Sequence, residues 1–244
     1  MARMRLITLV TNTDRSDFAR SHPLDDAKFA AMIRGVRPDW TVDAAWVCDG
    51  QFPEGIAGYD GIMITGSPAS VNSGEGWVTR LEALIRDRVA ARQPIFGACF
   101  GHQVIATALG GQVGPNPGGW VHGVSTCTPV ARTDWFGAKG AFDLYASHKE
   151  QVRQAPEGVE VLIASEDCPV GGYRIGDHVF TVQHHPEMTP GFIAALVEEL
   201  AEDLPNEVTA KARDRLAEAK VDGPQFAEWV ARFFEAAPGP KSAP

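Results

Sequence analysis

The residues best suited to covalent chemistry surround Cys99, in the pentapeptide Gly97-Ala98-Cys99-Phe100-Gly101. An apolar run, Pro94-Ile95-Phe96, precedes it, and a helix-like stretch follows from His102. Glycines on both sides of a nucleophile permit the tight strand-to-helix turn called a nucleophile elbow. Such a turn exposes the thiol at a helix N-terminus, where free N–H groups and the helix dipole stabilise a thiolate. The pattern predicts acyl chemistry at Cys99, although a free cysteine can also be a small buried hydrophobe.

A general base for this thiol is predicted at His185. Residues 179–185 alternate as a strand does, and the strand ends at Pro186, which cannot donate to a ladder. Residues two apart in an extended chain point to the same side, so Glu187 can orient His185. The neighbouring His184 faces the other way, and we expect it to pack within the strand.

A third element is predicted to hold the oxyanion of a tetrahedral intermediate. Residues 60–65 read as a buried strand, and the turn Gly66-Ser67-Pro68 follows with backbone N–H groups free to face a ligand. With the N–H of Phe100, the Gly66 turn would form an oxyanion hole. Most turns of this composition have no catalytic role, so the prediction of an oxyanion hole depends on the predicted nucleophile and base.

The elements that position these residues follow an alternating order. Strands are predicted near 5–11, 41–47, 61–65 and 94–98, with helices near 25–36, 78–92 and 101–110. Residues 112–183 read as shorter strands and hairpins. This βαβ order predicts an α/β domain whose active-site loops lie at the C-terminal ends of parallel strands, where Gly66 and Cys99 both fall.

Composition narrows the class of protein. A chain of 244 residues with 44% hydrophobic content can bury a full core as one domain. A net charge of −9 with scattered basic residues argues against nucleic-acid binding. The cysteines show no metal-binding or disulfide spacing, and no apolar run is long enough for a signal peptide or membrane span. We therefore expect a cytoplasmic protein that does not bind membranes and needs no metal or organic cofactor.

Three motifs together resemble the class I, or triad, glutamine amidotransferases, over roughly residues 5–200. They are Thr65-Gly66-Ser67-Pro68, the segment from Gly97 to Gln103, and Gln183-His184-His185-Pro186-Glu187. The resemblance implies a flavodoxin-like single domain with a mostly parallel central sheet and flanking helices. It also implies that Cys99 is the nucleophile, His185 the base and Glu187 its orienter. By the same resemblance Gly66 and Phe100 supply oxyanion contacts, and Ser67 and Gln103 hold the substrate.

Two further stretches are similar to different branches of that family. Ser147-His148-Lys149-Glu150-Gln151-Val152 is similar to a segment of GMP synthetase amidotransferase domains, which implies that Ser147 and His148 bind the amino-acid end of glutamine. On spacing alone, His148 with Glu150 would be a rival base. Val121-His122-Gly123 instead resembles anthranilate synthase amidotransferase subunits. The overall likeness is nearest to stand-alone GMP synthetase-like amidotransferase domains.

The sequence predicts hydrolysis of the γ-amide of glutamine, or of a γ-glutamyl amide, through a cysteine thioester. A stand-alone γ-glutamyl peptide hydrolase and a non-catalytic glutamine-binding subunit are the alternatives, and a synthase partner chain would accept any ammonia. Residues 1–204 are assigned to the amidotransferase-like domain. Residues 205–237 are expected to be a helical extension packed on it, with an apolar stripe from Phe226 to Phe233, and residues 238–244 a disordered tail. The oligomeric state is left open.

Overall fold

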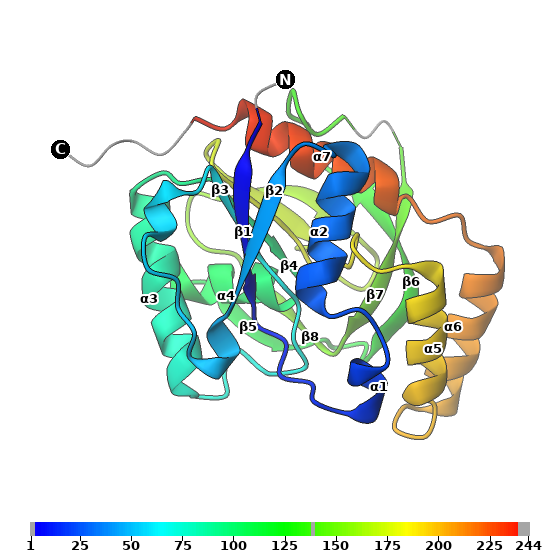
Figure 1. Cartoon of the computed structure of the whole chain (residues 1–244). Helices are drawn as coiled ribbons and strands as arrows, with labels where there is room; N and C mark the ends of the chain where they lie inside the picture. Colours follow the sequence, from blue (N-terminus) through cyan, green and yellow to red (C-terminus); the bar gives the residue numbers. More distant parts are fainter. Residues whose placement is uncertain (1–2, 138–139, 239–244) are drawn as a thin grey trace.

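One large sheet organises the computed structural model, which describes residues 3–137 and 140–238 (Figure 1). Within these residues nine strands form the sheet, in the order β2 (Thr41–Trp46), β1 (Arg5–Val10), β3 (Gly61–Ile64), β4 (Ile95–Ala98), β11 (Val179–Val182), β10 (Gly172–Ile175), β9 (Glu160–Ala164), β6 (Val121–Pro129) and β7 (Phe142–His148). The strands from β2 to β11 are parallel, and those from β11 to β7 pair antiparallel. The predicted α/β class with a mostly parallel sheet is confirmed.

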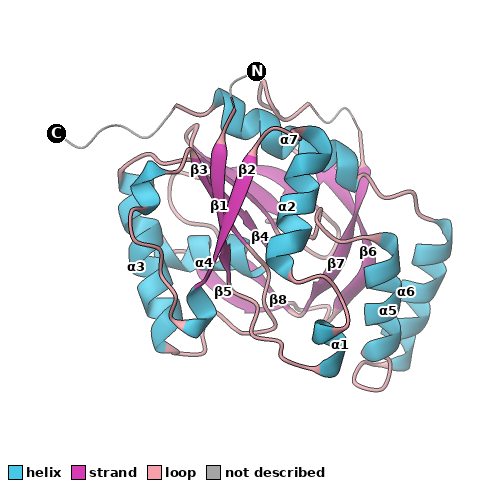
Figure 2. Ribbon diagram, viewed as in Figure 1, coloured by secondary structure: helices cyan, strands magenta, loops and turns pink. Residues whose placement is uncertain are grey.

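Helices cover both faces of this sheet, as Figure 2 shows. The helices are α1 (Asp17–Arg20), α2 (Asp25–Val36), α3 (Gly76–Ala90), α4 (Phe100–Ala108), α5 (Pro190–Glu199), α6 (Asn206–Glu218) and α7 (Gly223–Ala236), with short 3₁₀ turns η1 (Val47–Asp49) and η2 (Ile56–Gly58). The antiparallel strands β5 (Gln112–Pro115) and β8 (Glu150–Gln154) form a separate pair against α4. Helices α5 and α6 lie against β6, beside the antiparallel end of the main sheet.

Side chains of the parallel strands alternate between the two covered faces. On β1, Leu6 joins the hydrophobic cluster that contains residues of α2 and α7, whereas Ile7 joins the cluster that contains residues of α3 and α4. On β3, Met63 and Ile62 divide in the same way. A strand that is buried on both faces reads as a continuous apolar run, which is why the sequence identified these strands.

The C-terminal helix α7 inserts aromatic side chains into the core. Phe226, Trp229 and Phe233 are at most 6% exposed. The Phe226 ring stacks on Phe180 of β11, with ring centroids 5.6 Å apart. Phe180 also contacts Phe96 of β4, at 5.5 Å. Residues beyond the expected amidotransferase-like domain thus pack against the two strands that lead to the candidate site.

An ion-pair cluster joins α7 to the end of α2. The Arg37 guanidinium donates to Glu235 at 2.7 Å and to Glu228 at 2.8 Å. Its side chain is only 9% exposed, so the pairing is less screened by solvent than a surface ion pair.

The predicted element bounds agree closely with the structure. Helix α3 begins two residues before the expected 78–92, and α4 begins one residue before the expected 101–110. No helix in residues 3–137 and 140–238 combines the length and apolarity needed to cross a bilayer. Within the predicted tail 238–244, residues 239–244 lie outside the described residues.

Candidate active site

Cys99 lies in the sharp turn between β4 and α4, where the sequence predicts it. Its backbone adopts φ 50° and ψ −105°, a positive-φ conformation that costs a non-glycine residue free energy. The Cys99 N–H donates to the Val182 carbonyl of β11 at 2.9 Å, which ties the turn to the neighbouring strand. A strained residue held in this way presents its side chain at the strand end, as a nucleophile elbow does.

Close backbone contacts explain the glycines of the motif. A Cβ on Gly101 would lie 2.4 Å from the Ile64 carbonyl oxygen, and one on Gly97 would lie 2.7 Å from the Gly101 backbone. A Cβ on Gly66 would lie 2.9 Å from Cε1 of His185. These three positions therefore have room only for glycine, because β3, β4 and the His185 segment converge on Cys99.

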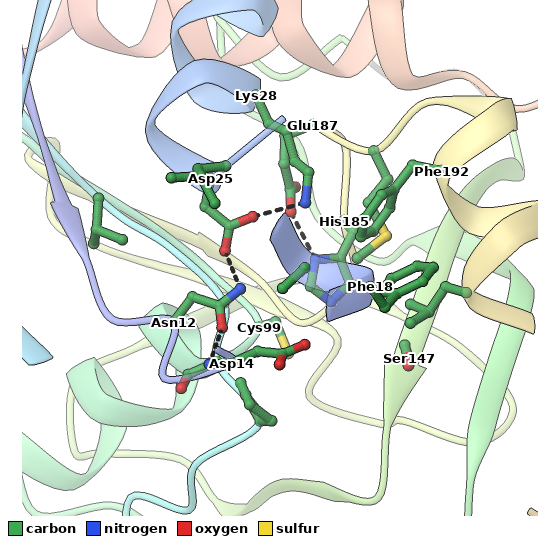
Figure 3. Close-up of a pocket in the computed structure, with 18 of the residues that line it drawn as sticks. Asn12, Asp14, Phe18, Asp25, Lys28, Cys99, Ser147, His185, Glu187 and Phe192 are labelled. Carbon is green, nitrogen blue, oxygen red and sulfur yellow. Dashed lines mark hydrogen bonds and ion pairs between the residues drawn. The ribbon is translucent and has the colours of Figure 1, made fainter. Parts of the chain in front are cut away.

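His185 and Glu187 form the hydrogen bond that their spacing predicts. His185 Nδ1 donates to Glu187 Oε1 at 2.7 Å, and both residues line the same cavity as Cys99 (Figure 3). The backbone N–H of His185 donates to the Tyr145 carbonyl of β7 at 2.8 Å, which fixes the position of the ring. Since Glu187 occupies Nδ1, the other ring nitrogen, Nε2, is left to serve the thiol.

Neighbouring charges control the protonation of His185. Burial alone lowers the pKa of this imidazole, but the carboxylate of Glu187 and the thiolate of Cys99 outweigh that effect. The pKa of His185 therefore lies well above its ordinary value. The imidazolium of His185 therefore lies beside Cys99, where it can donate a proton during the reaction.

Backbone N–H groups near Cys99 are available for a developing negative charge. In the described part of the chain, the N–H groups of Gly66 and Phe100 donate to no other group. The preceding Thr65 N–H donates to Leu9 in β1, and the Thr65 carbonyl accepts from Gly101. The turn after β3 is thus held against the elbow, with its free N–H at the cavity that Cys99 lines.

The cavity around Cys99 has a volume of about 400 Å³. Its wall includes the predicted residues Gly66, Ser67, Cys99, Ser147, His185 and Glu187. The remainder comes from the end of β1 and the segment after it, from α2, from α5 and its neighbouring residues, from two tryptophans, and from Asp49 and Pro68. These residues are Val10, Asn12, Asp14, Arg15, Phe18, Ala19, Arg20, Pro23, Leu24, Asp25, Lys28, Trp46, Asp49, Pro68, Trp120, Met188, Phe192, Leu196 and Leu200.

A buried polar group forms one wall of this cavity. Lys28 Nζ pairs with Asp25 at 2.9 Å, and both side chains are 9% exposed. Asn12 donates to the same carboxylate at 2.8 Å. In Figure 3, Asn12 and Asp25 lie on one side of His185, and Phe18 and Phe192 lie on the other. The cavity therefore has a polar side and an aromatic side.

Two of the residues predicted to bind substrate do not reach this cavity. Gln103 donates to the Glu150 carbonyl at 2.9 Å and to Gln183 Oε1 at 3.1 Å, so its amide joins α4 to β8 and the end of β11. His148 also donates to the Glu150 carbonyl, at 3.1 Å. Neither side chain lines the cavity. Both side chains therefore bond to neighbouring segments of the fold and do not face the cavity.

His148 belongs to a group of buried histidines that also contains His102 and His184. Burial lowers the pKa of His102 to about 3 and that of His148 to about 4. Burial, with the neighbouring histidines, holds the pKa of His184 well below its ordinary value. His184 is fully buried, stacks on His148 at 5.6 Å, and neither of its ring nitrogens has a hydrogen-bond partner among the described residues. These rings are neutral packing groups, and His184 points away from the cavity that His185 lines.

Sequence reasoning missed the segment after β1. Asn12, Asp14 and Asp25 carry polar groups to the cavity, and Phe18 carries an aromatic ring. The position of this segment could have identified it, because the C-terminal end of β1 lies at the same edge of the sheet as the C-terminal ends of β3 and β4. Within residues 3–137 and 140–238, no cluster of three or more His, Cys, Asp or Glu residues is arranged to hold a metal ion.

Comparison with known sequences places this geometry in a family. The model of class I glutamine amidotransferases matches residues 41–199. γ-Glutamyl peptidase 3 of Arabidopsis thaliana is 29% identical over 187 residues, which span 72% of this chain and 75% of that protein. A glutamine-hydrolysing GMP synthase of Porphyromonas gingivalis is 30% identical over 141 residues, 57% of this chain and 27% of that protein.

Solved structures show the same fold. A glutamine amidotransferase from Thermotoga maritima superposes with a TM-score of 0.75 at 16% identity, covering 96% of this chain and 100% of that one. A glutamine amidotransferase from Methylobacillus flagellatus has the same TM-score at 22% identity, with 99% and 97% covered. At these identities the likeness establishes architecture only.

Proposed function

Because the chain belongs to the class I glutamine amidotransferase family, we propose that its cysteine hydrolase activity resides in a triad of Cys99, His185 and Glu187. The observation that carries this proposal is the hydrogen bond from His185 to Glu187, in the cavity that Cys99 lines. We further propose that the substrate is a γ-glutamyl amide, and that glutamine is its smallest example.

The first half of the reaction forms a thioester. The Cys99 thiolate attacks the γ-carbonyl carbon, and the N–H groups of Gly66 and Phe100 stabilise the oxyanion. Protonated His185 then gives its Nε2 proton to the departing nitrogen, so the C–N bond breaks and an amine or ammonia leaves. Glu187 holds the imidazole in the required orientation and stabilises its charge.

The second half releases glutamate. Neutral His185 takes a proton from a water molecule, and the hydroxide attacks the thioester carbonyl. The tetrahedral intermediate collapses, the C–S bond breaks, and the electron pair returns to Cys99 as thiolate. Removing one oxyanion N–H typically lowers turnover 10²–10³-fold, so the positions of Gly66 and Phe100 contribute strongly to the rate, though less than the nucleophile and base.

Several features support a stand-alone hydrolase. The relative γ-glutamyl peptidase 3 aligns with this chain over 75% of that protein's length. In α7, Phe226 and Trp229 pack against the core and keep the C-terminal residues on the same domain. We therefore propose that residues 205–237 are an integral extension of the domain.

A second candidate is a glutaminase subunit that supplies ammonia to a synthase. It is favoured by the GMP synthase relative, because this chain matches only 27% of that longer protein. In that case a partner chain would accept the ammonia. For either function, the thiols of Cys48, Cys99, Cys127 and Cys168 are free, which supports a reducing, cytoplasmic location.

The test uses the purified full-length chain. Wild-type protein and a Cys48→Ala control should release glutamate from γ-glutamyl amides, whereas Cys99→Ala should not. A glutamine-analogue electrophile should label Cys99 alone. Activity in Cys99→Ala would overturn the triad, and activity that appears only when a synthase is added would favour the subunit function.

A further inference from the structure

We infer that the cavity contains a leaving-group subsite, built by Phe18, Leu24, Phe192 and Leu196, that binds an uncharged aromatic amine. The preferred substrate would then be the γ-glutamyl amide of an arylamine. This inference rests on the proposed function, because it concerns the part of the substrate that leaves when Cys99 is acylated.

The aromatic side of the cavity is a defined structure. The rings of Phe18 and Phe192 lie 5.7 Å apart, and His22 packs edge-on against both, at 4.5 Å and 5.3 Å. The Lys28 ammonium lies 3.6 Å from the Phe192 ring centroid. Leu24, at the same wall, is 49% exposed. An open apolar surface continuous with the nucleophile is suited to part of the reacting molecule.

The cavity has room for a leaving group larger than ammonia. Glutamine has ten non-hydrogen atoms, which need roughly 200 Å³ if each takes somewhat less than the about 30 Å³ of a liquid water molecule. The cavity holds about 400 Å³. Space therefore remains for a group on the amide nitrogen, beside the apolar side chains that α1 and α5 contribute to the wall.

The charges at the cavity favour an uncharged leaving group. The charged side chains nearest the aromatic side are already paired: Lys28 with Asp25 at 2.9 Å, and Arg20 with Asp17. Arg15 pairs with Asp49 at 2.8 Å at the same cavity. A polyamine or an acidic amine entering here would compete with these pairs, whereas an arylamine would leave them intact.

The subsite also lies partly outside the region that defines the family. The family model begins at residue 41, but Phe18 and Leu24 belong to the segment between β1 and α2. This segment is held in place by its own contacts with α5, because Phe18 and Lys28 both contact Phe192. Substrate preference can therefore be set by this segment without any change in the catalytic elements.

The experiment compares γ-glutamylanilide with glutamine as substrates of the full chain. Phe192→Ala removes a ring of the subsite, and Ala19→Phe fills it from α1. Both should lower kcat/KM for the anilide at least tenfold and change that for glutamine less than threefold. Glu199→Ala is the matched control on α5, because that side chain is exposed and does not line the cavity. Far-ultraviolet circular dichroism verifies the folding of each variant.

The wild-type protein should prefer the anilide to glutamine at least tenfold in kcat/KM. Equal losses on both substrates in both variants, or a wild-type preference for glutamine, would overturn the subsite while leaving the hydrolase intact. Undiminished hydrolysis by Cys99→Ala would instead overturn the proposed function. If the wild-type chain cleaves neither compound, the subsite inference is wrong as well.

Discussion

Acid should destabilise this protein through its buried histidines. His102, His148 and His184 are neutral in the fold, because burial lowers their pKa values. His148 donates its Nδ1 proton to a carbonyl and leaves Nε2 without a partner among the described residues. Protonation would therefore add a buried N–H with no acceptor.

The sign and size of the effect follow from linkage. An unfolded histidine takes up a proton below pH 6.5, whereas His102 and His148 do so only near pH 3 and pH 4. Stability is therefore present above pH 6.5 and falls as the pH decreases. Between pH 7 and pH 5 His102 and His148 each cost at most about 2 kcal/mol of unfolding free energy, or about 4 kcal/mol together, and His184 acts in the same direction.

His185 acts in the opposite direction. Its pKa is raised in the fold, so its stabilisation is complete below pH 6.5 and is lost as the pH rises through the folded pKa. On acidification from pH 7 to pH 5 it therefore offsets part of the loss from the buried neutral histidines. A net loss of up to about 4 kcal/mol remains, which is a large part of the stability of a typical domain.

Urea unfolding followed by tryptophan fluorescence at pH 7 and pH 5 measures this loss. His148→Gln should remove about 2 kcal/mol of the pH dependence. His22→Gln is the matched comparison variant, because His22 lies outside the buried cluster. Unfolding free energies that agree within about 1 kcal/mol at the two pH values would refute the reasoning.

Three further predictions concern the catalytic elements and α7. His185→Ala should lower turnover by several orders of magnitude in steady-state assays, whereas His184→Ala should act through stability; comparable kinetic losses in two folded variants would contradict their opposite orientation. Gly101→Ala should reduce turnover at least tenfold and lower the melting temperature, because its Cβ would lie 2.4 Å from the Ile64 carbonyl oxygen. Trp229→Ala should cost about 3–5 kcal/mol in urea unfolding without changing the KM of the folded fraction, and a loss below 1 kcal/mol would argue against a core role for α7.

The sequence predicted those parts of the site that depend on local geometry. The elbow around Cys99 follows from glycines that sit two residues away on each side, and the pairing of His185 with Glu187 follows from strand parity. Both depend on residues that are close in the chain. The parallel strands were predicted because their apolar runs are buried on both faces.

The rest depends on contacts between distant segments, which periodicity does not report. Asp25 and Lys28 lie on α2, more than 150 residues before Phe192, yet all three line one cavity. Gln103 was assigned to substrate by resemblance, but its amide instead bonds to Glu150 and Gln183, whose positions only the folded sheet determines. The aromatic side of the cavity was missed for the same reason.

The central claim, that Cys99 carries the acyl group, is tested most directly by mass spectrometry of the intact protein during turnover. After rapid acid quenching with a γ-glutamyl amide as substrate, the account predicts a mass increase of one γ-glutamyl group, located on the peptide that contains Cys99. The adduct should be absent from Cys99→Ala and retained in Cys48→Ala. Turnover with the adduct on another residue, or an adduct that persists in Cys99→Ala, would contradict the account.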